Sequence, residues 1–450
     1  MNQGERYDVL VIGAGGAGMT AALQASELGV SVMVVEKEPK IGGNTNRASS
    51  GMNAAESDVQ LQHGIVDSMT SFYQETFQGG GRLNDPEMLR FFVEHAPLAV
   101  EWLAKRQLPL TDLTITGGMS RPRTHRPQST APIGNYLVRG LADQLKKRQV
   151  PLLTGTRVSK LIVAEGRVAG VEVERHGQKQ SIKAQAVVLA TGGFGANARL
   201  ISRLRPDLSG LKTTNQAGAT GDGLRLAERV GAAFRDLSFI QVHPTVQQDQ
   251  AHTYLIGEAV RGEGAILVNQ QGRRFVNEMS TRRVVSEAIF ALLTKSAWLI
   301  FDQAVRQRVK AVDFYCSVGL VKQADGLQNL AQQIGADETQ LTQTVQEWNQ
   351  TVGKNLPDEY QRTTGRHQVV KAPFYAIHVA PAIHYTMGGL HTDPQTRVLN
   401  ENGQAIGGLY AAGEVVGGLH GNNRLGGNSI AETLVFGRQA GIQAVADQRH

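Results

Sequence analysis

The stretch Tyr7-Asp-Val-Leu-Val-Ile-Gly13-Ala-Gly15-Gly-Ala-Gly18 decides the fold of the first part of this chain. Its apolar residues predict a short strand, and a helix-like run follows the glycines from Met19 to Leu28. Gly13 allows a tight turn, Gly15 lets the backbone approach a pyrophosphate, and Gly18 lets the helix pack closely on the strand. We therefore expect a strand, a glycine turn and a helix whose N-terminus binds phosphate groups.

A second apolar run, Val30 to Val35, ends at Glu36, whose carboxylate is placed to accept hydrogen bonds from ribose hydroxyls. A G-x-G-x-x-G pattern alone is a weak signal, since a glycine-rich structural turn gives the same letters. Here strand, glycines, helix, second strand and acid follow in order and at the expected spacing. The N-terminal segment therefore predicts a Rossmann-like dinucleotide site.

Further glycine turns favour FAD over NAD. Ile41-Gly-Gly43-Asn44-Thr45 forms a second turn just beyond the acid, where the ribityl chain of a flavin would pass. Two remote apolar runs, Ala186–Ala190 and Gly408–Ala412, also lead into glycines. Each run is weak evidence alone, because buried strands often end in glycine. Together they match the pattern by which FAD proteins return remote strands to the cofactor.

Composition agrees with an enzyme of two domains, since 450 residues allow a large core. The longest apolar stretch, Ala288–Phe301, contains Lys295 and is too short to span a bilayer. No signal peptide precedes the first strand, and Cys316 is the only cysteine, so we expect a cytoplasmic protein without disulfides. The histidines show no metal-ligand spacing, and no metal site is expected. A net charge of +6 is mild and no basic run is interleaved with aromatics, which argues against nucleic-acid binding.

Nearly the whole chain resembles the flavoprotein of the fumarate reductase and succinate dehydrogenase family, and most of all the soluble flavocytochrome-type fumarate reductases. The resemblance implies an α/β fold with a Rossmann-like FAD-binding domain (1–233 and 386–450) and an inserted α+β capping domain (234–385) over the flavin. The matching segments occur in the family's order: Gly42–Asn53, Thr220–Gly223, His243–Thr245, Glu258–Gly262, Asn277–Arg282, His384–Gly389 and His420–Gly427.

Inside the expected capping domain, two segments carry apolar residues at helical spacing. They are Leu327–Ile334 and Leu341–Trp348, and Asp337 is placed to begin the second helix. We expect these helices to serve packing rather than chemistry.

Reduction of an activated alkene takes a hydride at one carbon and a proton at the other. By resemblance, the flavin delivers the hydride from N5, Arg282 delivers the proton, and Glu258 and Arg261 form the relay that reloads Arg282. A guanidinium scarcely deprotonates in water, so this role requires a dry site, neighbouring cations and Glu258 close by. Arg283 departs from the aspartate that the family usually has after the proton donor.

The resemblance also implies which residues hold the two carboxylates of a substrate such as fumarate. His243 would bind one carboxylate, and His384 and Arg424 would bind the other. Gly257 stands where the fumarate reductases usually carry a threonine that helps to hold a carboxylate, and the loop between His243 and Glu258 is longer than in those enzymes. Both departures touch one end of the substrate.

No histidine occupies the turn at Asn44-Thr45, where succinate dehydrogenases tether FAD, so we expect noncovalent FAD. No C-x-x-C-H haem motif is present, and we expect a separate electron-donor protein or a reduced carrier. By resemblance, the residues at the flavin are Gly13, Ala14, Gly15, Gly18, Glu36, Lys37, Gly43, Asn44, Thr45, Gly51, Met52, Asn53, Val158, Thr191, Gly192, Gly193, Asp222, Tyr385, Glu414, Arg424, Ser429 and Ile430.

The activity that the resemblance implies is reduction of fumarate to succinate. Alternatives are a reductase of another unsaturated acid such as urocanate, an enzyme of the L-aspartate oxidase kind, or a non-catalytic flavin electron relay. His243 argues against urocanate, because the urocanate relatives have a tyrosine at the matching position. The intact proton-delivery set argues against a relay.

Several of these residues have a purely structural alternative. Arg282 could form an ordinary salt bridge, since Glu278 is close in sequence, and Arg424 could brace a loop. His243 could be a structural histidine. The basic segment Arg121–Pro127 resembles one that family members place near the flavin, and a solvated surface loop is its alternative.

Overall fold

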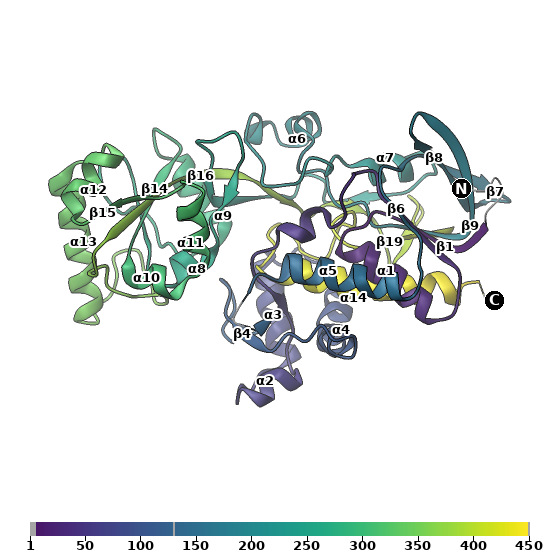
Figure 1. The fold of residues 1–450 in the computed structure, drawn as a ribbon, viewed down its shortest axis with the longest axis horizontal. Helices are drawn as coiled ribbons and strands as arrows, with labels where there is room; N and C mark the ends of the chain where they lie inside the picture. Colours follow the sequence, from purple (N-terminus) through teal and green to yellow (C-terminus); the bar gives the residue numbers. More distant parts are fainter. Residues whose placement is uncertain (1–5, 129–130, 449–450) are drawn as a thin grey trace. The chain divides into compact units, whose positions relative to one another are not determined.

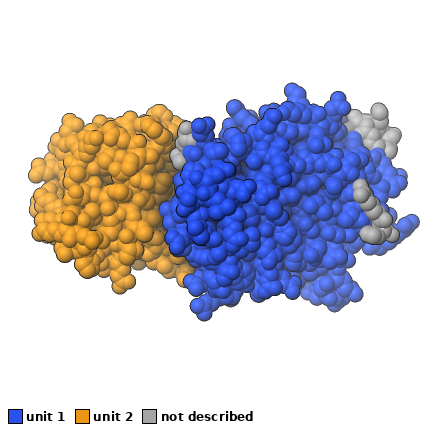
Figure 2. Space-filling model, turned by 90° about the horizontal axis from the view of Figure 1, so that it is seen from below, with its two compact units in different colours: residues 1–209, 215–241, 385–450 blue, residues 210–214, 242–384 orange. Residues whose placement is uncertain are grey.

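The structure is a computed structural model that describes residues 6–128 and 131–448. The chain divides into two compact units, which Figure 2 colours separately. Unit 1 comprises residues 1–209, 215–241 and 385–450, and unit 2 comprises residues 210–214 and 242–384. After the short segment 210–214, the chain enters unit 2 a second time within strand β11 (Ile240–Gln247) and returns to unit 1 within strand β16 (Phe374–Thr386).

Unit 1 is built on a sheet whose parallel strands lie in the order β19–β9–β1–β2–β6. The prediction that the runs beginning at Ala186 and Gly408 form strands is confirmed, since they belong to β9 and β19 in the same sheet as β1. The strands are β1 (Arg6–Ile12), β2 (Val32–Val35), β6 (Leu152–Leu153), β9 (Gln178–Leu189) and β19 (Ala405–Ala411).

Antiparallel strands complete this sheet, and helices cover it. Strand β18 (Arg397–Leu399) pairs with β19, and the hairpin of β7 (Arg157–Ala164) and β8 (Arg167–Arg175) pairs with β9. Figure 1 shows α1 and α14 side by side along the sheet. The helices are α1 (Gly16–Glu27), α4 (Pro86–Ala104), α5 (Ile133–Lys147) and α14 (Asn428–Ala446).

Small residues allow α1 and α14 to pack closely. A Cβ atom at Gly437 would lie 2.8 Å from the carbonyl oxygen of Ala17, and one at Gly441 would lie 2.5 Å from that of Ala21. Any larger side chain at these two positions would force the helices apart. This contact holds the N-terminal glycine turn and the C-terminal helix in one rigid arrangement.

A smaller antiparallel sheet of unit 1 has the order β3–β5–β4. Its strands and the helices beside it are β3 (Met52–Asn53), β4 (Asp112–Thr114), β5 (Thr124–Arg126), α2 (Asp58–Gln62) and α3 (Met69–Gly79). The other elements of unit 1 are η1 (Gly43–Arg47), α6 (Ala198–Leu204), η3 (Pro206–Leu208), α7 (Asp222–Glu228), β10 (Phe234–Arg235) and β17 (Gly389–Leu390).

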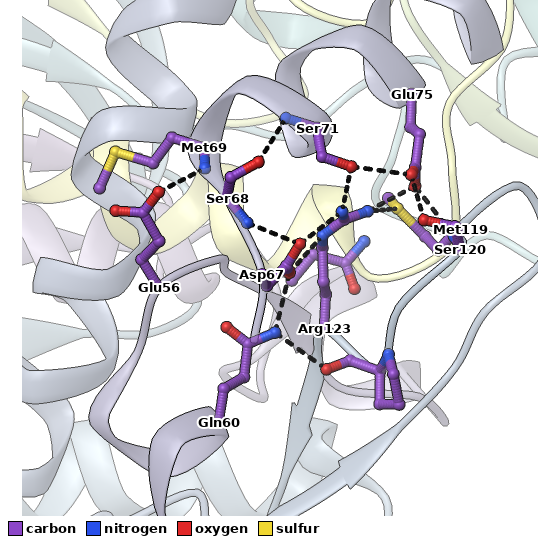
Figure 3. Close-up of polar contacts among 12 residues, drawn as sticks. Glu56, Gln60, Asp67, Ser68, Met69, Ser71, Glu75, Met119, Ser120 and Arg123 are labelled. Carbon is purple, nitrogen blue, oxygen red and sulfur yellow. Dashed lines mark hydrogen bonds and ion pairs between the residues drawn. The ribbon is translucent and has the colours of Figure 1, made fainter. Parts of the chain in front are cut away.

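The basic segment Arg121–Pro127 is not a solvated loop, and that alternative is wrong. Arg123 and His125 are both fully buried, the latter in β5. Figure 3 shows the Arg123 guanidinium between Asp67 and Glu75, with Nε 2.6 Å from Asp67 Oδ2. Two carboxylates therefore compensate the buried positive charge of Arg123. The run of basic residues in the sequence does not reveal these partners.

Unit 2 is built on a sheet in the order β12–β11–β16–β14–β13, with β15 also on β16. Alternate residues of its central strands face opposite sides. Leu299 and Ile377 pack with helices α8 to α11, whereas Ile300 and Ala376 pack with α12 and α13. The remaining strands are β12 (Tyr254–Leu255), β13 (Ile266–Val268), β14 (Ala297–Asp302) and β15 (Lys322–Ala324).

The two helices expected from periodicity in unit 2 are confirmed. Helix α12 spans Leu327–Ile334, and α13 spans Glu338–Gly353 after Asp337, whose side chain accepts the Gln340 N–H at 2.7 Å. The other helices are α8 (Glu258–Gly262), α9 (Arg282–Phe290), α10 (Gln303–Arg308) and α11 (Ala311–Ser317). Within residues 6–128 and 131–448, no helix has the length and apolar character needed to cross a bilayer.

Candidate active site

The glycine turn between β1 and α1 combines tight packing with open space. A Cβ atom at Gly13 would lie 2.3 Å from the Ala190 carbonyl oxygen, and one at Gly18 would lie 1.9 Å from the Gly13 carbonyl oxygen. At Gly15 the nearest atom to such a Cβ is 4.0 Å away. Gly13 and Gly18 are therefore required by the fold, whereas Gly15 leaves room beside the N-terminus of α1 for a ligand.

Glu36 ties this turn to the end of β2. Its Oε2 accepts the Ala14 N–H at 2.8 Å, and its Oε1 accepts the Glu38 N–H at 2.8 Å. Lys37 next to it donates to Asp222 Oδ2 at 2.9 Å. The acid therefore lies at the expected place beside the turn, and its binding of ribose hydroxyls stays a prediction.

Polar atoms and open space in unit 1 fit a dinucleotide with a polar ring system. A Cβ atom at Gly43 or at Gly192 would meet nothing within 4 Å. Thr191 Oγ1 and Asn428 Nδ2 are buried and make no hydrogen bond to other residues that the structure describes. The N-terminus of α14 has Gly427 as its cap and no capping side chain. A bound flavin would satisfy such groups, which otherwise carry a desolvation cost.

Two other residues predicted at the flavin, Asn44 and Glu414, are hydrogen bonded to each other within unit 1. Asn44 Nδ2 donates to Asn215 Oδ1 at 2.6 Å and to Glu414 Oε2 at 3.0 Å, and Thr45 Oγ1 accepts the Gly16 N–H at 3.0 Å. Burial raises the pKa of Glu414, and the Asn44 hydrogen bond opposes that shift. The others lie in or beside named elements: Gly51, Met52 and Asn53 at β3, Val158 in β7, Gly193 after β9, Tyr385 in β16, and Ser429 and Ile430 in the first turn of α14.

Arg424 is buried in unit 1, only 4% exposed, and its guanidinium has defined neighbours. Nη2 donates to Gln241 Oε1 at 3.0 Å, Nη1 donates to the Leu425 carbonyl at 3.2 Å, and Cζ lies 4.7 Å from the centre of the Tyr385 ring. Sequence reasoning missed Gln241. The signal was available, because Gln241 precedes His243 by two residues on the same strand and so shares its face.

In unit 2 the predicted proton-delivery residues lie together. Arg282 Nε donates to Glu258 Oε1 at 2.5 Å, and Arg261 Nη2 lies 3.9 Å from the same oxygen. Glu278, the neighbour suggested by sequence as a salt-bridge partner of Arg282, is bound by Arg274 and Arg362 instead. Arg282 is the first residue of helix α9 and Glu258 is the first residue of helix α8. The N-terminal ends of these two helices therefore position the ion pair.

Arg261 is buried among other charged side chains. Its side chain is 3% exposed, and burial lowers the pKa of this guanidinium below its ordinary value. Glu258 opposes the shift, while the positive charges of Arg282 and Arg362 lower the pKa further. Arg261 therefore lies in a buried and cation-rich environment, and its part in a proton relay stays a prediction.

Both predicted histidines lie in unit 2, with ring centres 5.2 Å apart. His243 Nδ1 accepts the Thr245 N–H at 3.3 Å, so in the neutral ring Nε2 carries the proton and is the donor. His384 Nδ1 lies 2.8 Å from Thr214 Oγ1. Gly257, the departure from the family threonine, donates its N–H to the hydroxyl of Tyr315 at 3.1 Å. The sequence does not predict this contact, because Tyr315 is far from Gly257 along the chain.

Comparison with known proteins gives a consistent result. Residues 8–430 match a family described as an FAD binding domain. The chain is 48% identical over 446 residues to an NADH:fumarate oxidoreductase of Klebsiella pneumoniae (strain 342), covering 98% of this chain and 48% of that protein. It is 43% identical over 442 residues to a fumarate reductase (cytochrome) of Shewanella frigidimarina, covering 98% of this chain and 77% of that protein.

Structural comparison agrees with the sequence comparison. The open conformation of a flavocytochrome c3 fumarate reductase superposes with a TM-score of 0.85 at 38% identity, covering 99% of this chain and 79% of that chain. The expected fold class, α/β with a Rossmann-like FAD-binding domain, is confirmed, and the observed fold has a parallel sheet and separate antiparallel sheets. The chain spans about half the length of the Klebsiella relative.

Proposed function

Because the chain belongs to the FAD-binding flavoprotein family of the fumarate reductases and succinate dehydrogenases, we propose that it reduces fumarate to succinate. The observation that carries the proposal is the arrangement of Arg282, Glu258 and Arg261 in unit 2, with one carboxylate oxygen 2.5 Å from the first guanidinium and 3.9 Å from the second. A flavin electron relay would have no need for this set of hydrogen-bonded proton carriers.

The flavin, when bound, supplies the hydride. We propose that residues 1–233 and 386–450 hold it as FAD-binding domain and that 234–385 act as capping domain. Asn44 and Thr45, at the position of the family's covalent tether, have no nucleophilic side chain of the histidine kind, which supports noncovalent binding. The electrons would come from a separate donor protein or a reduced carrier, and a cytoplasmic location stays a prediction.

Arg282 donates the proton in this proposal. Once Arg282 has given its proton to the substrate, Glu258 is the nearest group through which a proton can return, because their side chains are already hydrogen bonded. Arg261 gives a proton to the Glu258 carboxylate, which passes it on to Arg282, and Arg261 takes a replacement proton from solvent. The lowered pKa of Arg261 makes its donation less costly than that of an arginine in water. These steps move one proton through the path for each substrate reduced.

The family resemblance assigns the substrate carboxylates to three residues. His243, through Nε2, would bind one carboxylate, and His384 and Arg424 would bind the other. Charge-assisted hydrogen bonds of this kind are about twice as strong as neutral ones. The threonine usual in the family would place a hydroxyl at one end of the substrate, and Gly257 has none. This observation supports a second candidate function, reduction of a different unsaturated acid such as a monocarboxylic enoate.

The test is a screen of unsaturated acids against the purified holoenzyme with reduced viologen as electron donor. Fumarate should give the highest kcat/KM. Glu258→Gln should remove most of the activity, because the amide cannot return a proton to Arg282. Glu263→Gln, at the end of the same helix and paired with Arg308, is the matched control and should leave activity unchanged. No turnover of fumarate by the wild-type protein would contradict the proposal, and preference for a monoacid would favour the second candidate.

A further inference from the structure

Next to Arg424, unit 1 contains three buried, hydrogen-bonded side chains that the proposed chemistry does not use. Tyr385, His420 and Glu432, here called the Tyr385 triad, are 7%, 2% and 2% exposed. The Tyr385 hydroxyl donates to Glu432 Oε2 at 2.5 Å, and His420 Nε2 lies 3.0 Å from the same oxygen. The three residues come from β16, the glycine-rich segment before Arg424, and α14.

The triad contacts Arg424 through the ring of Tyr385. The guanidinium carbon lies 4.7 Å from the ring centre, which is within the range of a cation–π interaction. Gln241 accepts a hydrogen bond from the same guanidinium at 3.0 Å. One neighbour therefore supports the guanidinium through the aromatic ring and another holds Nη2, so together they define its orientation.

The hydrogen bond to Glu432 fixes the ring that supports Arg424. Because the Tyr385 hydroxyl donates to the Glu432 carboxylate, the phenol ring is held in one position. The bond also moves electron density toward the ring, which strengthens attraction to a cation on its face. Burial raises the pKa of Tyr385 well above its ordinary value, and Glu432 raises it further, so the hydroxyl stays protonated and remains a donor.

We propose that the Tyr385 triad positions Arg424 to bind a carboxylate of the substrate. The inference rests on the proposed function, which gives Arg424 that role. The three residues are positioning residues, because they act through Arg424. A loosened arginine weakens binding of the substrate carboxylate in the ground state and the transition state alike. The triad therefore affects KM much more than kcat.

The experiment compares Tyr385→Phe with Tyr410→Phe in the FAD-loaded protein. Tyr410 is a matched control, because it is 3% exposed and its hydroxyl donates to Asp447 Oδ2 at 2.7 Å. Tyr385→Phe should raise KM for fumarate about tenfold, equivalent to about 1.4 kcal/mol, with kcat nearly unchanged. Tyr410→Phe should change neither. The dissociation constant of succinate, measured from the flavin absorbance of the oxidised protein, should follow KM.

Glu432→Gln gives an independent check. It keeps an oxygen at the same place and removes the negative charge, so KM should rise in the same sense. If the residues act as a unit, the double variant Tyr385→Phe/Glu432→Gln should raise KM little more than the larger single change. Additive effects would overturn the triad.

Other outcomes separate this inference from the proposed function. An active wild-type enzyme with an unchanged KM in Tyr385→Phe, a fall in kcat alone, or an equal rise in KM in Tyr410→Phe overturns the triad and leaves the proposed function in place. Failure of the wild-type protein to reduce any unsaturated acid overturns the proposed function, and this inference falls with it.

Discussion

Replacement of Arg282 by alanine should separate catalysis from stability, and Arg283→Ala provides the matched control. Both residues lie in the first turn of α9, after the cap Thr281. Arg282 is the residue that is hydrogen bonded to Glu258, at 2.5 Å, whereas Arg283 is exposed. The two variants remove the same charge from the same helix end, and only one of them removes the proposed proton donor.

The effect of Arg282→Ala on stability should be close to zero. Its ion pair with Glu258 is partly exposed, with side chains 12% and 24% accessible, and such pairs contribute about 0–1 kcal/mol after screening. A positive charge in the first turn of a helix is unfavourable by about 0.3–1 kcal/mol, so its removal offsets that loss. The melting temperature should therefore move by no more than about 3 °C.

The effect on turnover should be far larger. General acid catalysis contributes about 10²–10⁴-fold, and we expect the upper end because no other donor is assigned to this proton. A loss of about 10⁴-fold corresponds to about 5.4 kcal/mol of transition-state stabilisation, which a stability change below about 1 kcal/mol cannot produce. Arg282→Lys keeps the charge without the planar fork and should recover little activity.

The assay is steady-state fumarate reduction with reduced viologen, together with FAD content and melting temperature for each variant. Arg283→Ala should keep wild-type turnover. If Arg282→Ala retains more than about a tenth of wild-type turnover, the residue is not the proton donor. An equal loss in Arg283→Ala would show that the charge of the helix end, and not the donor, limits the rate.

Three further predictions concern the cofactor, the substrate and acid stability. Denaturation should release all flavin as FAD, and fluorescence remaining on the polypeptide after gel separation would show a covalent link. Gly257→Thr should improve kcat/KM for fumarate by up to the value of one hydrogen bond to a charged group, about 1.5–3 kcal/mol, and should not improve a monocarboxylic enoate; equal gains in steady-state kinetics would show that Gly257 makes room for a larger substrate. Burial alone would raise the pKa of Asp67, but hydrogen bonds from Arg123 and Gln60 outweigh it and lower that pKa. The ion pair therefore stabilises the fold above the unfolded pKa and is lost as pH falls through the lower folded value, so Asp67→Asn should reduce the free energy of unfolding at neutral pH and flatten its decline in acid, as measured by urea unfolding across pH; parallel curves for the two proteins would refute this.

Local sequence patterns were sufficient for the elements whose structure depends on neighbours in the chain. Residues a few positions apart in the sequence predict the glycines of the first turn, the strands on either side of it and helix α12. Backbone sterics and periodic burial act over that range. Asp337 is predictable as the start of α13 for the same reason, because its side chain caps the helix within three residues. The resemblance then supplied the roles of Arg282, Glu258 and Arg261, and the structure brings these three side chains together.

Only the tertiary structure decided which distant charges meet. Arg123 stands in a run of basic residues that is compatible with a solvated loop, yet it is buried and forms ion pairs with Asp67 and Glu75. Likewise, Tyr385 and Glu432 are separated along the chain but share a hydrogen bond beside Arg424. A buried charge or hydroxyl must find a partner, but its partner depends on which elements the fold places side by side. The spacing of residues in the sequence therefore does not predict which partner a buried polar group has.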